Sequence, residues 1–440
     1  MVTVGGYASP AFGQSYCIER SRMVLVYVLN KLKQPLMPTT PVKARILLKQ
    51  GSAKVIRKLP FTIRLQYETS SYVAPLTHGV DTGSKILGSA VTDDAGNILY
   101  MSEVEVRNDI AGKLKSRRES RRNRRSRKTR YRQARWRNRK NSTKSGRFSP
   151  TMVSKVNAHL KEIRFVRSIL PIAKTVLETG SFDPHALKNP EVLNNPLLYQ
   201  QGANYGFANT KAYVLWRDGY KCHHCKGKSG DSRLHVHHIV FRTNGGSDNE
   251  RNLITLCKTC HDELHAGVWE LKLRGKRKEK LKHATQMNSI RVQLLRLLPE
   301  ATETFGFITK ENRQRYTAVK EHHVDAVFIA WQALGVRPVL KTNVVLQRRC
   351  VASGDYQRRK GTRSETPIPA GKIMGFLKFD KVRYRGNDYF IKGRFSTGYA
   401  ILMGLDGQKV DLKPIPKFNR MKRIEARKPW LTSHKTTASI

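Results

Sequence analysis

The 440-residue sequence has few acidic residues, few cysteines and no long apolar segment. It carries 33 Asp and Glu against 83 Lys and Arg, which gives a formal net charge of +50. No apolar run approaches the ~20 residues of a membrane-spanning helix, so no membrane association is predicted. Residues 1–22 lack the basic and apolar regions of a signal peptide and show no periodicity. We expect a flexible extension there, with either Met1 or Met23 as the true start.

The excess positive charge predicts a large nucleic-acid surface. Between Lys113 and Lys140, sixteen of 28 residues are Lys or Arg and only Glu119 is acidic. These basic residues favour a helix, and guanidinium groups match phosphate oxygens. We predict a bridge laid along nucleic acid; the alternative is a disordered basic arm. The arginines expected to contact nucleic acid are Arg117, Arg118, Arg121, Arg122, Arg124, Arg125, Arg127, Arg130, Arg132, Arg135, Arg137 and Arg139.

Three carboxylates stand out among the patterned segments. Asp81 interrupts, at its centre, the strand expected to open a hairpin over residues 78–91, and Asp is disfavoured at such a position. Glu178 ends the apolar strand 173–178, and Asp325 lies where a helix is expected to begin. Alone, Glu178 could face solvent and Asp325 could be a helix cap. Together the three resemble the acidic residues of the RNase H fold, which bind Mg²⁺, an ion that prefers oxygen ligands.

Two thiolate pairs enclose a group of histidines. Cys222 and Cys225 form one CxxC pair, Cys257 and Cys260 the other, and 31 residues separate the pairs. In a basic chain with only six cysteines, this spacing favours tetrahedral zinc over disulfides. The candidate functional residues within or just after this span are His237, His238, Asn252, His261 and His265. The last two stand at i and i+4 on one helical face.

The remaining patterns predict elements of less specific meaning. Periodic apolar residues predict amphipathic helices over 153–169 and 285–298. Residues 306–309 suggest a strand. From residue 371 to 412, short strands alternate with turns and suggest a small β-barrel. The tail after Pro429 is expected to be disordered.

The order of these parts resembles the IscB family of transposon-encoded RNA-guided DNA endonucleases, relatives of the type II CRISPR effectors. PLMP at 35–38 and YQQG at 199–202 are similar to the family's N-terminal motif and linker. The resemblance implies an α/β multidomain protein. It comprises a split RuvC (RNase H-like) domain with an arginine-rich bridge helix, an inserted ββα-metal HNH domain, and small N-terminal α+β and C-terminal β-rich modules.

The implied domains run in order along the chain. They are the flexible extension (1–22), a PLMP-type domain (23–72), RuvC-I (73–110), the bridge helix (111–147), RuvC-II (148–184), a linker (185–212), the HNH domain with its zinc site (213–268), a linker and RuvC-III (269–350), a β-rich domain contacting the target-adjacent motif or RNA (351–430), and a disordered tail (431–440).

The resemblance also implies residue roles. Asp81, Glu178 and Asp325 would bind two catalytic Mg²⁺ ions, with His322 as a further ligand or base. His238 would be the HNH general base, Asn252 would fix its loop, and His237, His261 and His265 would hold one ion. Many relatives carry Asp at the position of His237 and Asn at that of His261. This histidine-rich set could therefore favour Mn²⁺ or another softer ion, although Mg²⁺ is expected in the cell. The four paired cysteines would hold structural Zn²⁺.

The implied activity is RNA-guided cleavage of double-stranded DNA by a monomeric ribonucleoprotein in a prokaryotic cytoplasm, at the nucleoid when on target. HNH would cut the strand paired with a long structured guide RNA, and RuvC the displaced strand, after recognition of a short target-adjacent motif. Two alternatives remain open from the residues: a protein-only endonuclease of the homing or junction-resolving kind, and a nucleic-acid-binding scaffold whose sites are idle.

Overall fold

A computed structural model describes residues 24–70, 72–125, 148–273, 281–331, 337–352 and 371–437. The predicted extension over residues 1–22 lies outside this part of the chain. Residue contacts divide the protein into two compact units, residues 1–180 with 290–440, and residues 181–289. None of the helices described is both long enough and apolar enough to cross a membrane. The protein is a mixed α/β protein with several modules.

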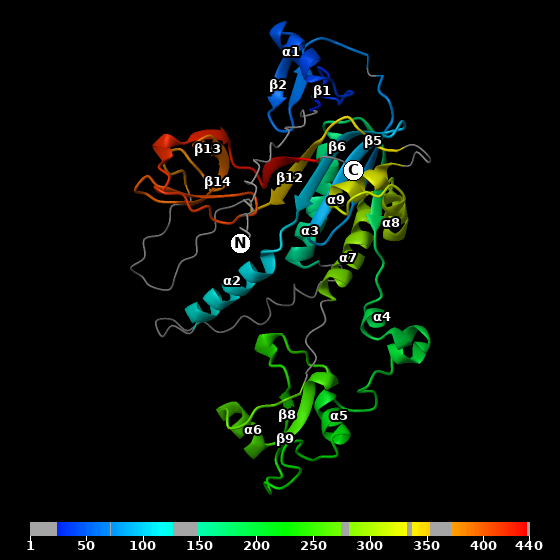
Figure 1. Cartoon of the computed structure of the whole chain (residues 1–440), viewed down its shortest axis with the longest axis vertical. Helices are drawn as coiled ribbons and strands as arrows, with labels where there is room; N and C mark the ends of the chain where they lie inside the picture. The colour runs from blue at the N-terminus through cyan, green and yellow to red at the C-terminus, as the bar shows by residue number, and fades with distance from the viewer. Residues whose placement is uncertain are drawn as a thin grey trace, which may run out of the picture. The chain divides into compact units, whose positions relative to one another are not determined.

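An eight-stranded mixed sheet forms the centre of the first unit (Figure 1). Its main path runs β10-β7-β4-β5-β6-β12-β17, and β11 pairs with β6. Strands β4, β5 and β6 are antiparallel neighbours, whereas β7 runs parallel to β4, β10 to β7, and β12 to β6. The strands are β4 (Leu76–Asp81), β5 (Ile86–Asp93), β6 (Asn97–Glu105), β7 (Ile172–Thr179), β10 (Thr302–Phe305), β11 (Val339–Leu340), β12 (Val344–Cys350) and β17 (Trp430–Thr436).

The two faces of this sheet bury different helices because successive strand residues point in opposite directions. On β5, Ala90 packs in a core cluster with Ala326 of α9 (His322–Ala330). The next residue, Val91, packs in another cluster with Val166 of α3 (Pro150–Arg167). The helix predicted over residues 153–169 is confirmed as α3.

Two glycines let α9 lie directly on the sheet. A Cβ atom at Gly79 of β4 would lie 2.3 Å from the carbonyl oxygen of Ala326, and one at Gly88 of β5 would lie 1.9 Å from that of His322. Real Cβ atoms do not approach backbone oxygen so closely, so any larger residue would displace the helix. Gly88 thereby holds the first turn of α9 close to β5, and Gly79 holds the later part of the helix close to β4.

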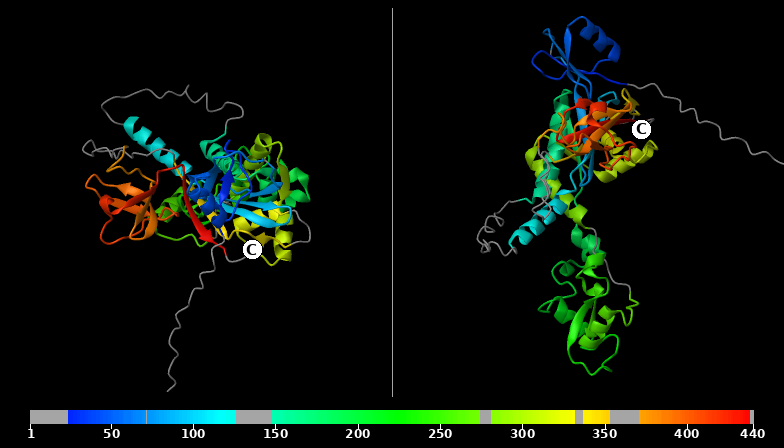
Figure 2. Two further views of the ribbon diagram at one scale, coloured as in Figure 1. Left: turned by 90° about the horizontal axis from the view of Figure 1, so that it is seen from above. Right: turned by 90° about the vertical axis from the view of Figure 1, so that its left-hand side faces the viewer.

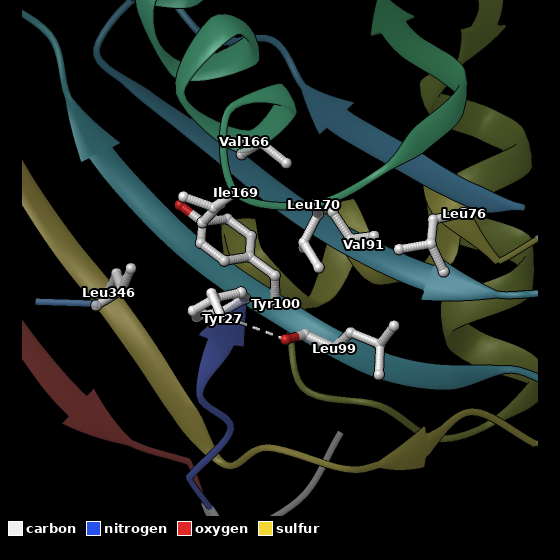
Figure 3. Close-up of a cluster of buried hydrophobic side chains, with 9 residues drawn as sticks. All are labelled: Tyr27, Leu76, Val91, Leu99, Tyr100, Val166, Ile169, Leu170 and Leu346. Carbon is white, nitrogen blue, oxygen red and sulfur yellow. Dashed lines mark hydrogen bonds between the residues drawn. The ribbon is translucent and has the colours of Figure 1, made fainter. Parts of the chain in front are cut away.

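The N-terminal module is a three-stranded sheet with one helix. The order β1-β3-β2 is built from β1 (Tyr27–Leu29), β2 (Ala53–Arg57) and β3 (Thr62–Leu65), with α1 (Pro41–Lys49) beside them. Tyr27 joins the module to the central core, since its hydroxyl donates to the carbonyl oxygen of Leu99 at 3.1 Å and its ring meets Tyr100 edge-on (Figure 3).

A buried ion pair links α3 to β12 and β6 on the same face of the sheet. Glu162 of α3 is fully buried; it pairs with Arg348 of β12 and accepts hydrogen bonds from Tyr100 and Ser102, both at 2.7 Å. The Arg348 guanidinium also lies 4.8 Å from the ring centroid of Trp430. A buried charge needs such partners.

The chain after Pro429 is an ordered strand, so the prediction of a disordered tail is wrong for residues 430–436. Strand β17 pairs antiparallel with β12 along its whole length. Leu431 is 1% exposed and packs with Phe390 and Met403. Packing against distant residues, together with backbone pairing, orders a segment whose own composition is polar.

The C-terminal module is a four-stranded antiparallel sheet, drawn in orange to red in Figure 2. Its order is β15-β14-β13-β16, and its edge strands β15 and β16 do not pair in the described part of the chain. The predicted barrel is therefore an open sheet. Its elements are β13 (Lys381–Tyr384), β14 (Asn387–Arg394), β15 (Ala400–Met403), β16 (Lys422–Glu425) and the 3₁₀ turn η6 (Phe418–Arg420).

A further prediction is wrong near residue 306. The expected strand over 306–309 is the first turn of α8 (Gly306–Arg315), and the strand β10 precedes it, ending at Phe305.

Asp81 is the last residue of β4 and does not lie at the centre of the strand. The amphipathic helix predicted over 285–298 is confirmed as α7 (Lys282–Leu297).

The second unit is a small ββα module preceded by short helical turns. Strands β8 (Leu234–His238) and β9 (Leu253–Cys257) pair antiparallel, and α6 (Lys258–Ala266) follows β9 directly. The other elements are α4 (Pro184–Lys188), η2 (Pro190–Leu193), η3 (Pro196–Tyr199), α5 (Thr210–Arg217), η4 (Arg242–Asn244) and η5 (Glu250–Asn252).

Candidate metal centres and nucleic-acid interface

Asp81 and Glu178 meet because their strands are parallel and in register. The pairing of β4 with β7 sets Asp81 directly opposite Glu178. The residue after Asp81 continues the contact, since the Thr82 hydroxyl donates to the Glu178 carbonyl oxygen at 2.6 Å. Both carboxylates therefore come from the same end of two adjacent strands, although 96 residues separate Thr82 from Glu178.

The first turn of α9 adds His322 and Asp325 to this pair. The Nδ1 atom of His322 lies 2.6 Å from Oδ2 of Asp81. This hydrogen bond raises the pKa of His322. Asp325 follows three residues later on the same helical face and pairs with Arg313 of α8 at 2.8 Å. The structure thus brings together all four residues predicted for this centre, which we call the carboxylate cluster.

The carboxylates of the carboxylate cluster carry like charges that repel one another. Burial, together with the neighbouring negative charges of Asp81 and Asp325, raises the pKa of Glu178 to about 7. Burial also raises the pKa of Asp81 and of Asp325. Oε2 of Glu178 is buried without a hydrogen-bond partner. Buried like charges and an unpartnered oxygen are the conditions that a bound cation relieves, so this donor set fits a divalent ion.

Among the described residues, the three carboxylates do not form a group whose oxygens all lie within 4.8 Å of one another. Residues that the sequence patterns did not single out surround them. Thr309 of α8 forms a hydrogen bond with Glu178 that opposes the rise of its pKa. Arg313 supplies positive charge beside Asp325. Neither residue belongs to a recognisable sequence motif. Each lies beside the carboxylates only because α8 directly follows β10.

The four paired cysteines gather in the second unit. Their sulfur atoms all lie within 4.8 Å of one another. The cysteines are free, and Sγ of Cys225 lies 3.8 Å from Sγ of Cys257, far beyond a disulfide bond. Apolar residues Leu234, Leu256 and Leu264 pack around them. Four thiols around one point, with no disulfide, fit tetrahedral zinc.

Three histidines form a second group in the same unit. Ligand nitrogens of His237, His261 and His265 lie within 4.8 Å of one another. His237 comes from β8, and the other two come from one face of α6. Burial and the two neighbouring histidines lower the pKa of His237 to about 4. His237 is thus neutral near pH 7, which is the form that binds a metal ion.

His238 points to a different partner, the carboxylate of Asp248. Nε2 of His238 lies 2.9 Å from Oδ1 of Asp248, which also accepts from Nε of Arg242 at 2.7 Å. Asn252 is fully buried and ties the intervening loop together, because it accepts from the Val240 amide at 2.9 Å and donates to the carbonyl oxygens of Val240 and Ser247. Sequence patterns identified His238 and Asn252 but missed Asp248, whose role depends on the fold of this loop.

The described part of the basic run is a helix, α2 (Ile110–Arg125). Arg117, Arg118, Arg121 and Arg122 are exposed on it. The backbone of α2 includes Arg124 and Arg125, whereas the predicted contacts from Arg127 to Arg139 lie outside the described residues. An exposed row of guanidinium groups is suited to a phosphate backbone.

Two family models match the chain. Residues 26–202 match the RRXRR protein family, and residues 222–267 match the HNH endonuclease family. The first match covers the strands that carry Asp81 and Glu178 together with α2 and α3. The second covers both CxxC pairs and all the histidines of the ββα module. The second unit thus contains an HNH endonuclease domain.

Shorter similarities connect the chain to characterised proteins. It is 37% identical over 62 residues to the type IV methyl-directed restriction enzyme EcoKMcrA of Escherichia coli (strain K12), covering 12% of this chain and 22% of that enzyme. It is 36% identical over 56 residues to anaredoxin of Nostoc sp. (strain PCC 7120), covering 13% of this chain and 68% of anaredoxin.

Among solved structures, Streptococcus thermophilus Cas9 in complex with the AGAA PAM matches at 12% identity with a TM-score of 0.31, over 58% of this chain and 32% of Cas9. The complex with the AGGA PAM matches at 13% identity and a TM-score of 0.30, over 50% and 31%. The chain thus spans about a third of the Cas9 chains and about a fifth of EcoKMcrA.

Zinc content tests the cysteine site. Cys257→Ser is expected to remove one equivalent of zinc per chain and to expose residues 181–289 to proteolysis, because metal binding stabilises a module with so small a core. Cys350→Ser is the matched control, since Cys350 lies in β12, outside the second unit. Elemental analysis and limited proteolysis give the two readouts. Equal zinc in both variants would contradict the assignment.

Proposed function

From the matches to the RRXRR and HNH endonuclease families, we propose that the chain is an RNA-guided endonuclease of the IscB and Cas9 type that cuts both strands of double-stranded DNA. The observation that carries the proposal is the carboxylate cluster of Asp81, Glu178, Asp325 and His322, present in a chain that also contains an HNH domain and an exposed arginine helix. Two hydrolytic centres suit two separated DNA strands.

The carboxylate cluster would act as the RuvC centre, in an RNase H-like arrangement of β4, β7 and α9. Asp81, Glu178 and Asp325 would hold Mg²⁺, which activates water and stabilises the charge of the phosphorane when bound. Asp81 orients His322 through Nδ1. Nε2 of His322 is then the nitrogen able to exchange a proton at the phosphodiester.

The HNH centre would use His238 as general base. In the neutral tautomer that donates from Nε2 to Asp248, the lone pair of His238 lies on Nδ1, which would take a proton from water. His237, His261 and His265 would hold one divalent ion beside it, Mg²⁺ in the cell or a softer ion such as Mn²⁺. The four cysteines would keep Zn²⁺ as a structural ion.

The basic surface would hold a long structured guide RNA. Exposed arginines of α2 would grip the RNA backbone, while base pairing between guide and target supplies the sequence specificity. HNH would cut the guide-paired strand and RuvC the displaced strand. The C-terminal sheet would contact the target-adjacent motif or RNA. The particle would be a monomeric ribonucleoprotein of the prokaryotic cytoplasm that engages the nucleoid at its target.

RNA dependence tests this function. The purified protein is expected to carry a long structured RNA, and RNase treatment is expected to abolish cleavage of double-stranded DNA because the target can no longer be paired. Sequencing of the bound RNA followed by cleavage of a matching duplex is the measurement. Cutting at specific DNA sequences without RNA would favour a protein-only endonuclease. RNA binding without any cleavage would favour an idle scaffold.

Strand-specific loss of activity tests the two centres. Asp81→Ala is expected to slow cleavage of the displaced strand and His238→Ala cleavage of the guide-paired strand, each by at least ~100-fold, which is the low end of acid–base contributions. Strands labelled separately report each cut. Asp94→Ala and His223→Ala, both at exposed positions, are the matched controls. Cleavage of both strands by either catalytic variant would refute the division of labour.

The raised pKa of Glu178 predicts how RuvC activity depends on pH and metal. Because this pKa is raised to about 7, the carboxyl keeps its proton at lower pH and must lose it to bind Mg²⁺. The Mg²⁺ concentration giving half-maximal cleavage of the displaced strand should rise as pH falls below about 7, by up to ~10-fold per pH unit. Titrations between about pH 6 and pH 8 measure this, and a constant requirement would contradict it.

A further inference from the structure

A cavity of about 610 Å³ is lined by residues of α2 and α3 in the first unit. Its floor is formed by the end of β12 and the start of β17, and Trp430 lines it. Its volume falls in the range of about 300–1,000 Å³ typical of small-ligand sites. None of its lining residues belongs to the carboxylate cluster or to the HNH module, so it is a separate feature of the protein.

The walls of this cavity combine apolar surface with polar edges. Leu114 of α2 is 37% exposed and Val153 of α3 is 47% exposed, although both are large apolar residues beside the cavity. Ser154 and Asn157 of α3 add hydrogen-bonding groups to the same wall. A planar ligand with apolar faces and polar edges matches this lining, and a nucleobase has those properties.

The cavity is also basic. Arg107, Lys113, Arg117 and Lys161 line it, and no lining residue is acidic. Asp109 pairs with both Arg107 and Lys113. Arg117 and Lys161 have no acidic partner in the described part of the chain, so net positive charge faces the opening. A nucleotide brings a phosphate to complement this charge.

The aromatic wall is held in place before any ligand binds. The Arg348 guanidinium lies 4.8 Å from the ring centroid of Trp430, and Phe165 lies 6.1 Å from it. Arg348 is itself fixed by its buried pair with Glu162. A preorganised aromatic surface loses little conformational freedom on binding, which favours stacking of a base.

We propose that this cavity binds one unpaired nucleotide of the RNA partner, with its base against Leu114, Val153 and Trp430 and its phosphate on Arg117 and Lys161. The proposal rests on the proposed RNA-guided function, because α2, whose exposed arginines would hold the RNA, forms one wall. Proteins recognise RNA chiefly by accepting unstacked bases into such pockets. The nucleotide would fix the position of the RNA along the bridge helix.

Ultraviolet crosslinking at 254 nm of the purified full-length ribonucleoprotein, followed by mass spectrometry, tests the proposal. Crosslinked RNA nucleotides are expected on peptides containing Leu114, Val153 or Trp430. Absence of crosslinks on these peptides in a particle that retains RNA would overturn the proposal alone. So would crosslinks there that carry target DNA instead of RNA. A protein that holds no RNA and cuts DNA without it would refute the proposed function as well.

A matched pair of variants gives a second readout. Ser154→Trp fills the cavity without changing charge and is expected to weaken binding of the recovered RNA about tenfold, consistent with the loss of one stacked base. Ser168→Trp makes the same change at an exposed position at the end of α3. Filter binding measures both affinities, and thermal melting checks that both variants fold. Equal affinities would overturn the proposal.

Discussion

Burial of like charges governs the architecture of the first unit. The register of β4 against β7 forces Asp81 and Glu178 to lie opposite each other in a desolvated setting, and α9 adds a third carboxylate. Such an arrangement is unfavourable unless positive charge is supplied. His322 and Arg313 supply part of it. An oxygen of Glu178 without a hydrogen-bond partner shows that the compensation from the chain itself is incomplete, and a divalent ion would complete it.

The close packing of α9 makes this cluster from residues far apart in sequence. Gly79 and Gly88 remove the side chains that would hold the helix away from the sheet. The second unit begins at residue 181, three residues after Glu178, and the chain then returns as β10, which pairs in parallel with β7. The HNH module is thus an insertion between two adjacent strands, and the sheet is continuous across it. This topology explains how one chain can carry an independent module without disrupting the carboxylate cluster.

Sequence patterns predicted the features whose chemistry depends on local spacing. The CxxC pairs, the i and i+4 histidines of α6, the hairpin after Asp81 and helix α3 all express short-range periodicity. The patterns failed where distant contacts decide. Strand β17 is polar and was expected to be disordered, yet it is held by backbone pairing with β12 and by burial of Leu431. Asp248 and Thr309 could not be found because their partners are defined only by folded loops and helices.

The carboxylate cluster and the histidine group differ in charge as well as in chemistry. The carboxylate cluster offers oxygen ligands with negative charge, which suit a hard ion and would neutralise much of its field. The histidine group contains no carboxylate, and the pKa of His237 is lowered to about 4, so at least this ligand is neutral at physiological pH. An ion held by neutral imidazoles keeps nearly all its charge for the phosphate. A single ion at the HNH centre could therefore polarise a scissile phosphate strongly, whereas the carboxylate cluster would need more than one ion for a comparable field.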